Sequence, residues 1–191
     1  MSSDCSCNRR AAVAMLAGAG LTLLGGIGAL ADDDPKSMRP QPDDVLVYAD
    51  GAKANKPIMV ADLKIGSPQI VAWAMDPSTK AIRDGSKLNQ ILVLAVDPSK
   101  MAEATKAHAT GDLVAYSAVC THAGCLVEGF EKTQQRLLCP CHQSEYDPAD
   151  AAKVIGGPAP SRLAALPIKA GSSGTIAVAG AFDGHVGIAK S

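Results

Sequence analysis

The stretches Cys120-Thr121-His122-Ala123-Gly124-Cys125 and Cys139-Pro140-Cys141-His142-Gln143-Ser144 decide how this chain is interpreted. Each offers a thiolate and an imidazole as metal ligands, and each contains a second cysteine. Sixteen residues separate the histidine of the first stretch from the first cysteine of the second. Two cysteines and two histidines on a pair of loops form an electron-carrier arrangement when the metal is a two-iron cluster.

The residues alone leave other interpretations open. A structural zinc ion also binds two cysteines and two histidines in a tetrahedron. That interpretation gives no role to the two extra cysteines. A pair of loops held only by disulfides is a further alternative, but it leaves both histidines unexplained. The two-iron cluster is therefore the favoured interpretation.

The region 113–168 resembles the Rieske [2Fe-2S] proteins. Both stretches match the family patterns C-T-H-x-G-C and C-P-C-H-x-S. A third segment, Gly157-Pro158-Ala159-Pro160, resembles the proline loop that covers the cluster in that family. The resemblance implies an all-β fold, with a Rieske-type antiparallel β-sandwich base, a small inserted cluster-binding subdomain and one short helix.

The resemblance also implies which residues hold the [2Fe-2S] cluster. Cys120 and Cys139 would bind one iron, and His122 and His142 would bind the other. Neutral imidazole donates less electron density than thiolate, so such a cluster accepts an electron more readily. The imidazoles would face a partner protein.

Four further residues match family positions around the cluster. Cys125 and Cys141 match the two cysteines that form a disulfide between the loops. Ser144 and Tyr146 match hydroxyls that donate hydrogen bonds to a bridging sulfide and to a cysteine sulfur. Such donors stabilise the reduced, more negative cluster and raise its reduction potential.

The rest of the chain reads as short strands separated by turn residues, which is typical of all-β sheets. Alanine-rich Ser99–Ala109 is the helical candidate. We expect the Rieske domain to span residues 45–191, with the cluster-binding part at about 118–160. The predicted strands are Val45–Tyr48, Pro57–Ala61, Gln69–Ala74, Ile91–Asp97, Leu113–Val119, Arg136–Cys139, Ala164–Lys169, Thr175–Ala179 and His185–Ala189.

Composition limits the classes of function. The 191 residues carry a formal charge of −1, which does not favour nucleic acid binding. Aromatic residues make up only 3%, so small aliphatic side chains must build the core. The sequence contains no convincing nucleophile–base pair. We therefore expect an electron-transfer subunit without a substrate-converting site of its own.

The N-terminus has the sequence pattern of an export signal. Asn8-Arg9-Arg10 precedes the uncharged run Ala11–Ala31, which ends in Ala29-Leu30-Ala31. This pattern predicts that residues 1–31 are a cleaved twin-arginine signal peptide and that the protein is periplasmic. An uncleaved membrane anchor through residues 11–31 facing the periplasm is the alternative, since the run is about 31 Å long as a helix. Residues 32–44 are acidic and rich in proline, which predicts a tail or linker.

Two complex types compete. Two segments, Asp112–Ser117 and Ser144–Pro148 running into Ala151–Lys153, resemble the small subunit of arsenite oxidase, whose large subunit carries molybdopterin. The hydroxyls of Ser144 and Tyr146 and the proline loop resemble instead the Rieske subunit of the quinol-oxidising cytochrome bc complex. We expect the first type, with the second and a free-standing periplasmic carrier as alternatives. The expected partners are a molybdopterin subunit or a cytochrome b, and a cytochrome c or similar acceptor.

Overall fold

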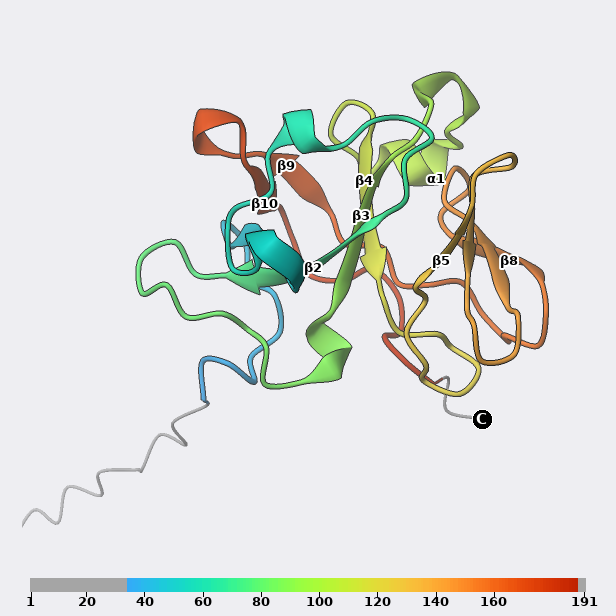
Figure 1. The fold of residues 1–191 in the computed structure, drawn as a ribbon, viewed down its shortest axis with the longest axis horizontal. Coiled ribbons are helices and arrows are strands. Elements are labelled where there is room, and N and C mark those ends of the chain that lie inside the picture. The colour runs from blue at the N-terminus through green and yellow to red at the C-terminus, as the bar shows by residue number, and fades with distance from the viewer. Residues whose placement is uncertain (1–33, 189–191) are drawn as a thin grey trace, which may run out of the picture. The chain divides into compact units, whose positions relative to one another are not determined.

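The computed structural model describes residues 34–188, which form two antiparallel sheets (Figure 1). The larger sheet has six strands in the order β4-β3-β2-β1-β10-β9, and the smaller has four in the order β5-β6-β7-β8. This confirms the predicted all-β class. The strands of the larger sheet are β1 (Val45–Tyr48), β2 (Ile70–Met75), β3 (Ile91–Ala95), β4 (Leu113–Ser117), β9 (Ile168–Ala170) and β10 (Ile176–Val178). Those of the smaller sheet are β5 (Gly129–Glu131), β6 (Arg136–Leu138), β7 (Glu145–Asp147) and β8 (Lys153–Gly156).

Strands β3 and β4 are buried on both faces, because hydrophobic clusters cover the larger sheet from both sides. Every residue of the two strands is buried. Alternate side chains point to opposite faces of a strand. Leu92 and Tyr116 thus belong to one cluster, whereas Ile91 and Ala115 belong to the other. Continuous apolar sequence in these strands follows from this two-sided burial.

The smaller sheet is inserted between β4 and β9, as the resemblance implied. Its strands have three or four residues each. One hydrophobic cluster joins it to the larger sheet, with Leu92 and Tyr116 contributed by the larger sheet and Leu137 and Tyr146 by the smaller. The two predicted metal-binding stretches, residues 120–125 and 139–144, lie in the loops that precede β5 and β7.

Two predicted strands are wrong. Pro57–Ala61 forms only isolated bridges, Val47 with Pro57 and Met59 with Thr175, because the chain turns into a 3-10 helix at Val60. Within His185–Ala189, the described residues 185–188 form no strand. The His185 ring instead donates from Nε2 to the carbonyl of Ile188 at 2.8 Å, which holds a turn.

The helix predicted at Ser99–Ala109 is much shorter in the structure. Helix α1 spans only Glu103–Lys106, after a 3-10 turn at Pro98–Lys100. The amide of Ile168 donates to the carbonyl of His108 at 3.1 Å, which draws the chain away from the helical path. Alanine content alone could not reveal this competing contact.

Residues 34–44, for which the sequence predicts a tail or linker, are held against the larger sheet. Asp44 and Arg83 form a buried ion pair, with oxygen–nitrogen distances of 2.5 and 3.0 Å. Arg83 also donates to the carbonyl of Pro35 at 3.1 Å. The side chain of Asn89 donates to the carbonyl of Met38 at 2.7 Å.

Across residues 34–188, no helix has the length and apolar character needed to cross a membrane. The predicted signal peptide or anchor, residues 1–31, lies outside the described residues.

Candidate metal centre

The two metal-binding stretches fold into loops with the same backbone pattern. The amide of Gly124 donates to the carbonyl of Cys120 at 3.0 Å, and the amide of Gln143 donates to the carbonyl of Cys139 at 3.0 Å. The fifth residue of each loop has a positive φ, 72° at Gly124 and 56° at Gln143. The left-handed conformation closes each loop around its first cysteine.

The thiols of Cys120 and Cys139 lie together at the edge of the core. Both cysteines are buried within the cluster that joins the two sheets. Burial alone would raise the pKa of the Cys120 thiol, but hydrogen bonds from Tyr146 and from nearby backbone amides outweigh it and lower that pKa. Burial raises the pKa of the Cys139 thiol, and the neighbouring Cys120 sulfur adds to the rise. The loops therefore supply donors to sulfur anions in a site that excludes water.

The two histidines face one another. The ring centroids of His122 and His142 lie 4.7 Å apart, and the rings are nearly perpendicular at 89°. His142 is exposed, whereas His122 is half-buried. The Nδ1 atom of His122 is buried and has no hydrogen-bond partner among residues 34–188. A buried ring nitrogen without a partner suits a metal ligand.

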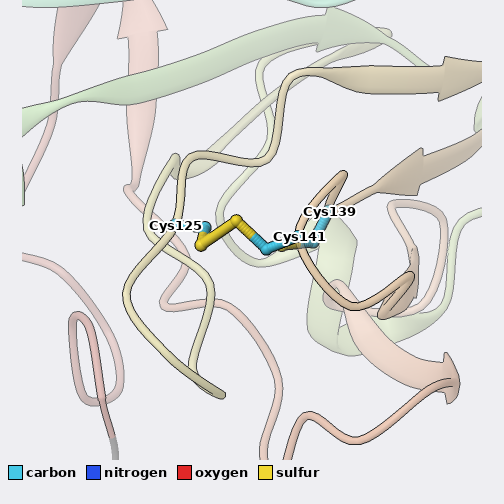
Figure 2. A group of neighbouring side chains, drawn as sticks. All are labelled: Cys125, Cys139 and Cys141. Atoms are coloured by element: carbon cyan, nitrogen blue, oxygen red, sulfur yellow. A yellow bond between two sulfur atoms is a disulfide. The ribbon is translucent and has the colours of Figure 1, made fainter.

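The second cysteines of the two loops form a disulfide. Cys125 and Cys141 are bonded and join the loops, as Figure 2 shows. The Cys139 sulfur lies within 4.8 Å of both disulfide sulfurs. Because Cys125 and Cys141 are bonded to one another, neither offers a thiolate, so these three sulfurs do not make a metal site by themselves. The disulfide instead packs against one proposed ligand and fixes the distance between the loops.

The two hydroxyl residues predicted to tune the site both lie in it. Tyr146 Oη is 3.1 Å from Cys120 Sγ. Burial, followed by the hydrogen bond with Cys120, raises the pKa of Tyr146, so its hydroxyl keeps its proton. Ser144 is buried, and its Oγ has no hydrogen-bond partner in the part of the chain that the structure describes.

The proline loop packs against the second metal-binding loop. A Cβ atom on Gly157 would lie 2.5 Å from the carbonyl oxygen of Gln143 and 2.6 Å from Cα of Ser144. Only glycine fits this close approach, and its φ of 77° favours glycine as well. Ala159 anchors the loop in the core cluster, while Pro158 and Pro160 are exposed.

One contact in the site was not predicted from the sequence. The hydroxyl of Thr121, which is buried, donates to the carbonyl of Ser161 at 2.6 Å. This bond ties the first metal-binding loop to the residue after Pro160. The proline loop and the residue after it therefore contact both predicted metal-binding loops. The only sequence signal for this contact is the threonine inside the pattern C-T-H-x-G-C.

The site has the donor set that a [2Fe-2S] cluster needs. The two buried thiols and the two facing imidazoles could supply four ligands. The unpartnered Nδ1 of His122 would face a metal, and the unpartnered Oγ of Ser144 would face a sulfide acceptor. A zinc ion would satisfy the ring nitrogen but not the hydroxyl, since it brings no acceptor.

Comparisons with known proteins agree with this geometry. The family described as Rieske [2Fe-2S] domain matches residues 72–167. The cytochrome bc1 complex Rieske iron-sulfur subunit of Streptomyces lividans is 33% identical over 139 residues, which cover 70% of this chain and 79% of that protein. The subunit of the same name from Streptomyces coelicolor is also 33% identical over 139 residues, but the match covers only 38% of that protein.

A third relative has a name that refers to a different complex. The putative respiratory nitrate reductase subunit Rieske of Haloferax mediterranei is 49% identical over 73 residues, which cover 38% of this chain and 32% of that protein. Among solved structures, the plasma membrane Rieske protein of Synechocystis PCC 6803 matches with 25% identity and a TM-score of 0.41, covering 63% of this chain and 93% of that one.

Proposed function

Because the chain belongs to the Rieske [2Fe-2S] domain family, we propose that it is the Rieske subunit of a quinol-oxidising cytochrome bc complex. Its cofactor is a [2Fe-2S] cluster, and its function is electron transfer through that cluster. Such a cluster accepts and releases single electrons. The name of the Streptomyces lividans relative is the observation that supports the assignment to this complex.

We propose that Cys120, Cys139, His122 and His142 hold the cluster. The two thiols lie in the core and receive hydrogen bonds from backbone amides, which suits them as the inner ligands. The exposed ring of His142 lies on the protein surface and can present one nitrogen to a partner. In a quinol-oxidising complex this nitrogen would accept the proton that accompanies the electron.

The residues around the ligands support a centre of mid-to-high potential. The hydroxyls of Tyr146 and Ser144 would each donate to a sulfur atom, which stabilises the reduced form. These hydroxyls and the proline loop are features of the cytochrome bc type. The same features count against the arsenite oxidase type, which the sequence favoured. The names of the relatives reported above also favour the cytochrome bc type over the arsenite oxidase type.

One relative supports a second candidate for the complex that contains this chain. The Haloferax mediterranei relative shares more identity over its shorter match, and its name gives a nitrate reductase. Ala123, which stands where cytochrome bc subunits typically carry leucine, is exposed beside His122 and also fits a different partner. A subunit of another oxidoreductase complex, in which a larger subunit converts the substrate, is therefore the alternative.

We also propose that the protein works outside the cytoplasm, exported by the twin-arginine route or anchored through residues 11–31. The disulfide between Cys125 and Cys141 supports an oxidising compartment. The mass of the mature chain tests this proposal. A chain that begins near Asp32 indicates a cleaved signal, and a chain that retains Ala11–Ala31 indicates an anchor.

The complex is tested by isolating it through this chain and measuring its metals and haem. Iron together with haem b and without molybdenum is the expected result. Iron with stoichiometric molybdenum and without haem b would overturn the cytochrome bc proposal and favour the arsenite oxidase type or the nitrate reductase type. Iron alone would overturn it as well and would indicate a free-standing carrier.

A further inference from the structure

Gly124 is buried although the residue before it, Ala123, is exposed. The atoms that cover Gly124 come from two distant segments. A Cβ atom built on Gly124 would lie 3.4 Å from Ile188 Cδ1 and 3.7 Å from Lys87 Nζ. Figure 1 shows the C-terminal segment, in red, running beside this loop.

The C-terminal segment, residues 184–188, is fixed at both ends of its described path. Before it, Asp183 and Ala165 exchange backbone hydrogen bonds of 2.7 and 2.9 Å. Within it, the bond from His185 Nε2 to the carbonyl of Ile188 closes a turn. Gly187 has a φ of 87°, and a Cβ there would lie 3.0 Å from Leu88 Cδ2. The segment therefore sits in a defined position against the 3-10 turn Lys87–Asn89.

The same turn contacts the metal-binding loop directly. Lys87 Nζ donates to the carbonyl of Gly124 at 3.3 Å. The turn is itself held from its other side, because Arg39 donates to the carbonyl of Leu88 at 2.7 Å. The Lys87–Asn89 turn thus joins the loop of His122, the C-terminal segment and the segment that leads into β1.

We propose that Ile188 and Lys87 are positioning residues for the loop that carries His122. Ile188 covers Gly124 from one side, and the Lys87 ammonium holds its carbonyl from another. Metal ligands keep their geometry only when the surrounding residues restrain them. The positive charge of Lys87 also favours the reduced, more negative centre. This proposal rests on the cluster-binding role of the family and does not depend on which complex contains the chain.

The test uses the full-length holoprotein and three kinds of variant. Ile188→Ala and Lys87→Ala remove the two contacts, and Lys87→Arg restores a cationic donor. Ile65→Ala is the matched control, since Ile65 is 48% exposed where Ile188 is 56% exposed, and it lies in a different loop. Iron content, the melting temperature, hydrogen exchange of the amides of residues 121–125 and the reduction potential are measured for each.

We expect hydrogen exchange of residues 121–125 to rise about threefold or more in Ile188→Ala and Lys87→Ala, with little change of melting temperature. The reduction potential of Lys87→Ala should fall, the fall should shrink at high ionic strength, and Lys87→Arg should restore the original value. Loss of iron from Ile188→Ala but not from Ile65→Ala would also support the proposal. Unchanged exchange and potential in both variants, or equal changes in Ile65→Ala, would overturn it.

Discussion

The phenol oxygen of Tyr146 lies 3.1 Å from the sulfur of Cys120, inside the cluster that joins the two sheets. The amide of Thr121 donates to the same oxygen at 3.4 Å. Since one lone pair is already engaged, the hydroxyl proton is free to point at the sulfur. When Cys120 is a thiolate it has no proton, so Tyr146 must be the donor.

Replacing Tyr146 by phenylalanine should lower the reduction potential of the holoprotein. The lost hydrogen bond stabilises the more negative, reduced form more than the oxidised form. If that difference is about 1.4 kcal/mol, the potential falls by about 59 mV. A redox titration followed by electron paramagnetic resonance measures the change.

Tyr116→Phe is the control for this prediction. The Tyr116 hydroxyl is also buried, but it donates to the carbonyl of Pro148 at 2.7 Å and not to a cysteine. Its loss should cost about 1 kcal/mol of unfolding free energy and leave the potential unchanged. Equal potentials in Tyr146→Phe and the parent protein would contradict the role proposed for Tyr146.

Replacing Ser144 by alanine should stabilise the apoprotein and lower the reduction potential of the holoprotein. In the apoprotein it removes a buried hydroxyl that lacks a partner within residues 34–188, so stability should rise by about 1 kcal/mol. In the holoprotein it removes a donor to sulfide, so the potential should fall. Ser117→Ala is the matched control, because the Ser117 oxygen accepts from the amide of Val119 at 3.2 Å. That variant should lose stability in both forms, as chemical denaturation would show.

Sequence patterns located the site because its chemistry is local. The proposed ligands and the hydroxyl of Ser144 belong to two short stretches whose spacing is informative by itself, and Tyr146 follows two residues after the second stretch. The contact of Thr121 with Ser161 spans forty residues, and that of Lys87 with Gly124 spans thirty-seven. Nothing in the sequence at those positions marks such pairs, since a lysine or threonine that makes a long-range contact looks like any other in sequence.

The fold shows the same division. Strands β3 and β4 were predicted because their continuous apolar runs reflect burial on both faces. Strands β5, β7 and β8 were missed, since a strand of three or four residues shows too little alternation to be recognised. Pro57–Ala61 has the residues of a strand, but the chain turns at Val60 before a ladder forms.

Comparing Gly157→Ala with a control glycine should separate the stability cost of close packing from the cost of backbone strain. The added Cβ would meet the carbonyl of Gln143 at 2.5 Å, at a residue whose φ is 77°. We expect a loss of about 2 to 4 kcal/mol and release of the proline loop from the second metal-binding loop. Gly111→Ala is the control, since its φ is 62° and a Cβ there meets nothing within 4 Å. It should lose only about 1 kcal/mol and keep its iron. Equal losses in thermal unfolding would show that the close approach is unimportant.

Arg83→Ala should destabilise the protein by about 4 kcal/mol, because it leaves the buried carboxylate of Asp44 without its partner. The double variant Asp44→Ala with Arg83→Ala should lose less than the single variant, since no uncompensated charge remains. Lys106→Ala breaks the exposed pair with Glu103 and should cost no more than about 0.5 kcal/mol. Urea unfolding of the variants measures these differences. A double variant less stable than Arg83→Ala would mean that Asp44 stabilises residues 34–44 by a contact other than Arg83, and its bond from the amide of Gln41 at 2.8 Å would be the first to examine.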